Sequence, residues 1–179
     1  MRIFTTLAIS AVLIGSYAHN VIAQAPPDPL AACGDDRISF EVNRGEVKNQ
    51  TVPPEPGKAT LYIVEVVSLS DNGRVNRPTL KHGLDGQWIG ATQGFTYLSA
   101  SISPGEHHIC SRWQSRLRAL SDQISLYNFN AEAGIRYYLR AQIYSTGKDS
   151  FAMDLTPVSA DEGRYLVSEA ARSLSKPKH

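Results

Sequence analysis

The stretch "TLKHGLDGQWIGA" (residues 79–91) decides the fold class of this chain of 179 residues. Two short runs typical of strands flank Asp85 and Gly86. An Asp-Gly pair favours a two-residue hairpin turn because both central positions of that turn take positive φ. The stretch therefore predicts two strands joined by a tight turn, which is a unit of an all-β fold.

Runs with strand character continue on both sides of this hairpin. Residues 59–69 ("ATLYIVEVVSL") are almost continuously apolar, which predicts a central strand. A second hairpin is expected where residues 124–134 and 135–145 flank Gly134. Short strands separated by turn residues are typical of an antiparallel β-sandwich, which is the fold class that we predict. Further strands are expected at 37–42, 95–102, 107–113 and 151–158.

One short helix is expected near the C-terminal end of the chain. The residues from Ser159 to Glu162 have the S-x-x-E pattern of a capping box, and apolar residues follow at helical spacing. Residues 114–123 fit either a short helical excursion or an exposed loop. The expected layout is a signal peptide at 1–23, a linker and N-terminal extension at 24–36, the β-sandwich domain at 37–172 and a disordered tail at 173–179.

The first residues are typical of a secretory signal peptide. One positive charge at Arg2 precedes an apolar run over residues 3–18, and Val21-Ile22-Ala23 has the small or branched residues of a cleavage site. An uncleaved membrane anchor needs roughly 20 apolar residues, and polar residues interrupt this stretch. We predict cleavage after Ala23, with Ala18 as the second choice. The mature chain is then exported to the periplasm or the extracellular space and has no transmembrane segment.

The stretch "PLAACGDD" (29–36) spells a lipobox in front of Cys33. A lipobox must directly follow the apolar region, but the proline-rich "HNVIAQAPPDP" lies between, so lipid anchoring at Cys33 is not expected. The chain has one other cysteine, Cys110, and two cysteines in an exported chain most simply form one disulfide. Such a bridge would stabilise the fold by roughly 4 kcal/mol in the chain-entropy model. The alternative is a pair of buried free thiols.

Composition and motifs exclude several classes of function. Removing the signal peptide takes away Arg2 and no acidic residue, so the formal net charge falls from +1 to zero, without a basic bias for nucleic acid. His107 and His108 point to opposite faces of a strand, and no third ligand stands at a suitable spacing for a metal. The sequence has neither a G-x-S-x-G elbow nor a phosphate-binding glycine loop with its lysine, so we expect no enzyme and no cofactor. An enzyme would need His82 or His108 beside a carboxylate in a polar cleft.

Three residues are candidates for contact with a ligand. Trp88 lies just beyond the predicted turn, and Trp113 ends a predicted strand. An exposed aromatic ring would stack on a sugar or anchor a protein contact, whereas the alternative is that both tryptophans face the core. Arg112 stands in a local basic cluster with Arg116 and Arg118, which fits either an anion site or a solvated edge.

Five stretches between residues 54 and 170 form a combined pattern. They are "PEPGKATLYIVE" (54–65), "GLDGQWIGA" (83–91), "FTYLSASISPGEHHICSRW" (95–113), "AEAGIRYYLRAQ" (131–142) and "PVSADEGRYL" (157–166). The Pro-Gly-Lys start of the first strand, the Asp-Gly hairpin, the Gly-Tyr-Tyr segment and the Ser-rich acidic helix cap together resemble a bacterial family of small exported domains of unknown function. The hairpin and the "PGEH" turn (104–107) also resemble PEGA-type surface repeats, which are small β-sandwiches.

The resemblance implies a β-sandwich in the cell envelope, since members of that family are often envelope proteins, some of them lipid-anchored, with no established activity. The chain departs from the family by adding residues 24–53 and a long loop at 70–78. It also adds the cysteine pair, which looks like a subgroup feature bridging "ACGD" to "HHIC". We therefore expect an exported, non-catalytic and monomeric module that binds an envelope protein or polysaccharide, or is structural. A periplasmic carbohydrate-binding or hydrolytic domain is the alternative.

Overall fold

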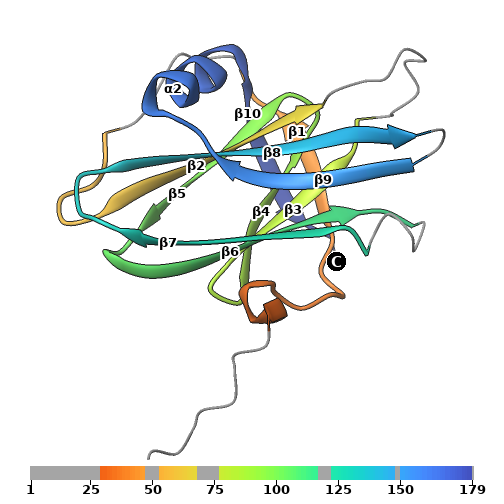
Figure 1. The fold of residues 1–179 in the computed structure, drawn as a ribbon, viewed down its shortest axis with the longest axis horizontal. Coiled ribbons are helices and arrows are strands. Elements are labelled where there is room, and N and C mark those ends of the chain that lie inside the picture. Colours follow the sequence, from red (N-terminus) through yellow and green to blue (C-terminus); the bar gives the residue numbers. More distant parts are fainter. Residues whose placement is uncertain (1–28, 47–52, 68–76, 117–121, 148–149, 179) are drawn as a thin grey trace, which may run out of the picture.

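The computed structural model describes residues 29–46, 53–67, 77–116, 122–147 and 150–178. Within these ranges a short 3-10 helix precedes ten strands, and one α-helix lies between the last two strands. The predicted all-β fold with a short helix near the C-terminal end is confirmed (Figure 1). The elements are η1 (Pro29–Ala32), β1 (Phe40–Arg44), β2 (Ala59–Val67), β3 (Thr79–Leu84), β4 (Gln87–Gln93), β5 (Thr96–Ile102), β6 (Gly105–Gln114), β7 (Ile124–Ala131), β8 (Arg136–Gly147), β9 (Ser150–Pro157), α2 (Ala160–Glu169) and β10 (Ala171–Pro177).

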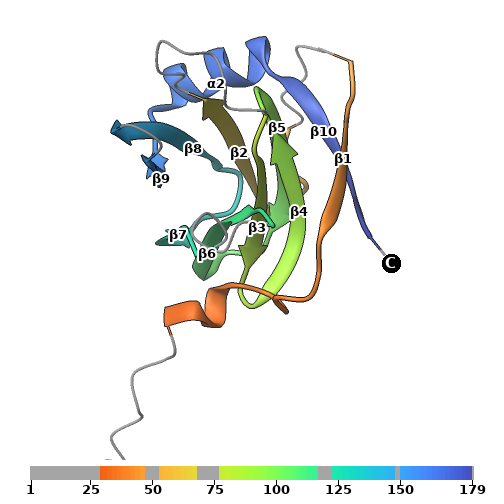
Figure 2. The ribbon, with the colours of Figure 1, turned by 90° about the vertical axis from the view of Figure 1, so that its right-hand side faces the viewer.

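The strands form two sheets with a shared core. The larger sheet has the order β1-β10-β5-β2-β8-β9, and the smaller sheet has the order β4-β3-β6-β7. Figure 2 shows α2 against the outer side of the larger sheet, and the end strands β9 and β7 on the same side of the molecule. The core between the sheets consists of apolar side chains from both, including Leu61, Ile63, Leu80, Ile109, Trp113, Leu139 and Ile143.

The strand β2 is buried on both faces, which explains its continuous apolar sequence. Leu61 and Ile63 pack in the core between the sheets, whereas Tyr62 packs under α2. The helix begins where Ser159 Oγ accepts a hydrogen bond from the backbone N–H of Glu162 (3.1 Å), so the predicted cap is formed. The larger sheet is therefore covered by the smaller sheet on one face and by α2 on the other.

The hairpin predicted at Asp85 and Gly86 is present. The strands β3 and β4 pair antiparallel from Leu84 and Gln87 outward. Asp85 (φ 50°) and Gly86 (φ 86°) both have positive φ, as the turn requires. The Asp85 carboxylate also accepts a hydrogen bond from the backbone N–H of His108 (2.8 Å), so the neighbouring strand β6 helps to hold the turn.

The second predicted hairpin, over residues 124–134 and 135–145, is wrong. The strand β7 pairs with β6 in the smaller sheet, whereas β8 pairs with β2 in the larger sheet. The connection at Gly134 (φ 81°) passes between the sheets, and its backbone N–H donates to the carbonyl oxygen of Lys58 (2.8 Å). The strand β8 therefore pairs with β2, which is distant in sequence, and not with β7, its neighbour across the turn at Gly134.

The sandwich is mixed rather than wholly antiparallel, because β2 with β8 and β5 with β10 are parallel pairs. The predicted disordered tail at 173–179 is also wrong, since Ala171–Pro177 forms β10 and pairs with β1. Two hydroxyl groups fix this strand to β4 of the other sheet. Ser173 Oγ donates to the carbonyl oxygen of Ala91 (2.5 Å), and Ser175 Oγ accepts from the Ala91 N–H (3.1 Å). Hydrogen bonds rather than an apolar pattern therefore hold this strand.

Other expectations concern the margins of the described chain. The predicted signal peptide and residues 24–28 of the predicted linker and extension lie before Pro29, outside the described residues. Of residues 114–123, Gln114 belongs to β6, and 117–121 lie outside the described residues. The domain begins before the predicted start at residue 37, because η1 packs on β6. No helix in the described ranges is long and apolar enough to cross a membrane.

Candidate functional site

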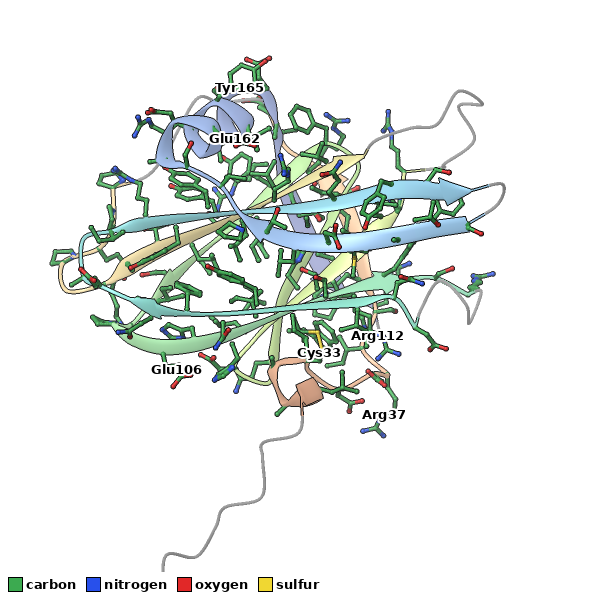
Figure 3. The ribbon with its side chains drawn as sticks, viewed as in Figure 1. Cys33, Arg37, Glu106, Arg112, Glu162 and Tyr165 are labelled. Atoms are coloured by element: carbon green, nitrogen blue, oxygen red, sulfur yellow. A yellow bond between two sulfur atoms is a disulfide. The ribbon has the colours of Figure 1, made fainter. Side chains whose placement is uncertain are left out.

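Residues 29–38, here called the N-terminal segment, are covalently bonded to the smaller sheet. Cys33 and Cys110 form the predicted disulfide, with their Cα atoms 5.1 Å apart. Cys110 is fully buried in β6, so the bond ties the segment to the middle of the sheet (Figure 3). The sulfur atom of Cys33 that a lipid anchor would take is bonded to Cys110.

Trp88 contacts the N-terminal segment. Its Nε1 donates to the carbonyl oxygen of Asp35 (2.7 Å). A Cβ atom on Gly34 would lie 2.5 Å from the indole, so only glycine permits this approach. The ammonium of Lys81 lies 4.2 Å from the indole centroid and donates to the carbonyl oxygen of Ile38 (2.9 Å). Trp88 and Lys81 therefore hold the segment in place.

Arg112 and Trp113 are also used within the fold. The Arg112 guanidinium pairs with Asp36 of the N-terminal segment, and 17% of the Arg112 side chain is exposed. Trp113 is 6% exposed and belongs to the core between the sheets, so the alternative of a core-facing tryptophan holds for it. Of the three candidate ligand residues, Trp88 and Arg112 therefore contact the N-terminal segment, and Trp113 lies in the core. Of the wider basic cluster, Arg116 is exposed, and Arg118 lies outside the described residues.

A chain of buried polar side chains connects the two sheets. The imidazole of His82 lies 2.8 Å from Ser111 Oγ through Nδ1 and 2.8 Å from Thr92 Oγ1 through Nε2. Thr92 Oγ1 donates to the carboxyl group of Glu65 (2.6 Å), which also accepts from the backbone N–H of Gly94 (2.8 Å). All four of these polar side chains are fully buried, so the series has no surface that a substrate could reach.

Burial determines the protonation states of the two titratable groups, Glu65 and His82, in this series of buried polar side chains. It raises the pKa of Glu65 to about 8, although the hydrogen bonds from Thr92 and Gly94 act to lower it. Burial lowers the pKa of His82 to about 3. Both groups are therefore mainly uncharged at neutral pH, which is the state that a structural hydrogen-bond network in a core requires.

His107 and Asp85 form a second histidine–carboxylate contact. His107 Nδ1 lies 2.6 Å from Asp85 Oδ2, and Nε2 lies 2.7 Å from the carbonyl oxygen of Ser103. Burial acts against the charged ring, but the hydrogen bonds to Ser103 and Asp85 outweigh it and raise the pKa of His107. When His107 is protonated, both of its ring nitrogens donate, and it joins two turns. Across the described residues, no group of three or more His, Cys, Asp and Glu side chains is placed to hold a metal ion.

An aromatic cleft lies where β7 and β8 belong to different sheets. Counting the space at its open mouth, it measures about 360 Å³. The ring centroids of Tyr127 and Phe129 are 5.9 Å apart, and those of Phe129 and Tyr137 are 4.7 Å apart. All three rings are half-buried, so each contributes an edge or face to the cleft. The cleft is lined by Tyr127, Phe129, Arg136, Tyr137, Pro157 and Val158, among others.

Tyr137 is held in the cleft by its hydroxyl group. This oxygen accepts from the backbone N–H of Glu132 (2.9 Å) and donates to the carbonyl oxygen of Asn130 (3.3 Å). The ring is thereby fixed before any ligand binds. A concave site with fixed aromatic rings and a few polar groups suits an apolar or ring-shaped ligand group.

A second cavity, here called the outer hollow, lies on the opposite face of β7. It measures about 420 Å³ with its open side, and Leu126, Tyr127 and Asn128 of β7 line it. Tyr127 also lines the aromatic cleft, whereas Phe129 lines the aromatic cleft alone. Ala32, His108 and Ile109 complete the wall of the outer hollow, and His108 Nε2 lies 3.5 Å from the Glu106 carboxylate. Because Ala32 adjoins Cys33, the disulfide positions one side of the outer hollow.

The sequence did not reveal the aromatic cleft. Tyr127 and Phe129 alternate with polar residues, and Tyr137 follows Gly134, so the aromatic pattern was available. A hairpin was expected there, and a hairpin would have placed these rings in one sheet. They meet at the rim between two sheets because β7 and β8 separate after Ala131.

No family model matches the chain, and no curated protein matches it. The resemblance to small exported bacterial domains and PEGA-type repeats therefore stays a prediction, and the function is argued from geometry.

Proposed function

We propose that the chain is an exported, non-catalytic module of the bacterial cell envelope, and that it binds a partner protein or a surface polymer in the aromatic cleft. The observation that carries the proposal is the contact series of half-buried rings, Tyr127, Phe129 and Tyr137, at an open cavity. Rigid aromatic side chains give a large contact area at a low entropic cost, and they dominate many binding surfaces.

The disulfide supports export. The bond between Cys33 and Cys110 persists in an oxidising compartment such as the periplasm or the extracellular space, and it is rare in the cytosol. The apolar N-terminal run with its cleavage pattern points in the same direction.

The placement of His82 and His107 supports a non-catalytic role. His82 and Glu65 are sealed in the core, where no substrate reaches them. The two ring nitrogens of His107 are hydrogen-bonded to Asp85 and Ser103, which belong to two turns. General acid–base catalysis needs a titrating group within hydrogen-bond reach of a substrate, and neither His82 nor His107 offers that arrangement. His108 is half-exposed and lies 3.5 Å from the Glu106 carboxylate, so it is the histidine that a hydrolytic alternative would use.

The test is recovery of an envelope component by the oxidised, immobilised protein and two variants. Phe129→Ala removes the central ring of the cleft. Tyr165→Ala is the matched control, because Tyr165 is 64% exposed on α2 (Figure 3) and is not among the residues that line the cleft. The proposal predicts a component that wild type and Tyr165→Ala recover and Phe129→Ala does not.

Equal recovery by all three proteins would refute the cleft as the binding site. Thermal unfolding of each variant shows whether loss of recovery comes from loss of the fold. Tyr137→Phe is a gentler second variant, since it removes only the hydroxyl group that fixes the ring. Protein and sugar analysis of the recovered material then distinguishes a partner protein from a polymer.

A further inference from the structure

The free side of β7 presents backbone groups that no other strand of the described chain takes up. The N–H of Trp113 donates to the carbonyl oxygen of Gln123 (3.2 Å), which lies opposite it in the register of β6 and β7. This bond shows which opposite pairs of the two strands are hydrogen-bonded. In an antiparallel ladder hydrogen-bonded and non-hydrogen-bonded pairs alternate, so Ser125, Tyr127 and Phe129 bond to β6. The N–H and C=O groups of the residues between them point away from β6. They belong to Ile124, Leu126, Asn128 and Asn130.

The open part of this edge centres on Leu126 and Asn128. At one end β9 approaches, and its Leu155 N–H donates to Ser125 Oγ (2.9 Å). At the other end the carbonyl oxygen of Asn130 accepts from the Tyr137 hydroxyl group (3.3 Å). Between these contacts β7 ends the smaller sheet (Figure 1).

The edge also lacks the usual protection against pairing. Natural edge strands carry charges or proline, or are covered by other chain. The sequence of β7, "ISLYNFNA", has no charged residue and no proline. By contrast, β1 carries Glu41 and Arg44, β9 carries Asp154 and Pro157, and the outer edge of β4 is bonded to Ser175 of β10.

Cavities flank this edge on both faces. Phe129 lines the aromatic cleft, Leu126 and Asn128 line the outer hollow, and Tyr127 between them borders both. Successive side chains of an added strand would point alternately to these two faces. Recognition by strand addition uses this arrangement: backbone hydrogen bonds supply affinity, and pockets for alternate side chains supply specificity.

We propose that an extended segment of a partner polypeptide binds by adding a strand to β7, with an apolar or aromatic side chain in the aromatic cleft. This inference rests on the proposed function and names the partner class of the same cleft. A second copy of the chain fits less well. If a second copy paired through its own β7, its Phe129 would already be packed on its Tyr137, with centroids 4.7 Å apart, so that ring would not be available to fill the cleft.

The probe is the best binder selected from a displayed library of random peptides on the oxidised protein, synthesised and measured by fluorescence anisotropy. Asn128→Pro removes one outward N–H and leaves the bonds to β6, because proline is tolerated where the N–H faces away from the ladder. Asn128→Ala is the matched control that keeps the N–H. We expect Asn128→Pro to weaken binding by about tenfold or more and Asn128→Ala to bind like wild type.

A peptide scan gives the same test without altering the protein. Methylation of single backbone nitrogens is expected to abolish binding at every second residue of the peptide and to spare the residues between. Loss of binding in Phe129→Ala, with unchanged Asn128→Pro and no alternation, would overturn strand addition and leave the cleft function intact. Failure to select any peptide, or a dimer of the chain that Asn128→Pro dissolves, would also overturn the inference, while envelope recovery tests the cleft separately.

Discussion

The indole Nε1 of Trp88 donates a hydrogen bond to the backbone carbonyl oxygen of Asp35 at 2.7 Å. An aromatic residue with the features of a ligand anchor thus binds the N-terminal segment of its own chain. The same segment carries Cys33 and one wall of the outer hollow, so its attachment shapes the surface next to β7.

Trp88→Phe is expected to lose this hydrogen bond and, because phenyl is smaller than indole, part of the ring contacts as well. The free energy of unfolding should fall by at least about 1 kcal/mol, which is typical for the hydrogen bond alone. Trp113→Phe is a useful comparison, because Trp113 lies in the core and its loss is a packing change. Urea unfolding measures both, and an unchanged value for Trp88→Phe would show that the bond does not contribute.

Removal of the disulfide is expected to be the costlier change. The cysteines are 77 residues apart in sequence, and the chain-entropy model gives roughly 4 kcal/mol for closing a loop of this size. The double variant Cys33→Ala/Cys110→Ala should lose stability on this scale in urea unfolding, and the N-terminal segment should become sensitive to proteases. Wild-type stability in the double variant would mean that Trp88, Lys81 and Arg112 hold the segment without the bond.

The pH dependence of stability follows from the buried polar chain. The pKa of Glu65 is raised to about 8, so the folded state keeps a proton that the unfolded state releases near 4.5, and stability falls as pH rises between these values. The pKa of His82 is lowered to about 3, so stability falls as pH drops below 6.5. The two slopes oppose each other between 4.5 and 6.5, where the curve should be flattest.

Glu65→Gln tests the alkaline side of this curve. The raised pKa of His107 adds a loss of stability as pH rises above 6.5, so the fall in the variant should be smaller but not absent. Each such group contributes a slope of up to about 1.4 kcal/mol per pH unit. Urea unfolding between pH 6 and 9 should show the reduced slope in Glu65→Gln and not in Glu41→Gln, an exposed control on β1. Parallel curves for all three proteins would contradict the charge assignment.

Gly163→Ala tests the contact between α2 and the larger sheet. A Cβ atom at this position would lie 2.2 Å from Cγ of Tyr138, inside its van der Waals surface. Alanine favours a helix over glycine by about 1 kcal/mol, but the overlap is expected to outweigh this and cost about 1–3 kcal/mol. Thermal unfolding measures the change, with Glu169→Ala on the exposed side of α2 as control. A stabilised Gly163→Ala protein would show that the helix moves aside freely.

Local features were predictable from the sequence because neighbouring residues determine them. The turn at Asp85 and Gly86 and the cap at Ser159 depend on side chains within three positions. The continuous apolar run of β2 correctly indicated a central strand, since that strand is buried on both faces. The partner of Cys33 was predictable because the chain has only two cysteines.

Features that depend on distant residues were not predictable. The strands β7 and β8 on either side of Gly134 separate because β8 pairs with β2. That pairing depends on residues 60–67, which lie far from 124–145 in sequence. The last strand, β10, has no alternation of apolar residues, so its sequence resembled a disordered tail. Hydrogen bonds of Ser173 and Ser175 hold it in place. The candidate site was missed for the same reason, since its rings come together only when the sheets form.

Amide hydrogen exchange at Leu126 and Asn128, with and without the selected peptide, tests the central claim most directly. Their N–H groups point away from β6, whereas that of Tyr127 is already bonded to it. Strand addition predicts that exchange at Leu126 and Asn128 slows strongly when the peptide binds, and that exchange at Tyr127 changes little. Unchanged exchange at Leu126 and Asn128 in a protein saturated with peptide would contradict binding at this edge.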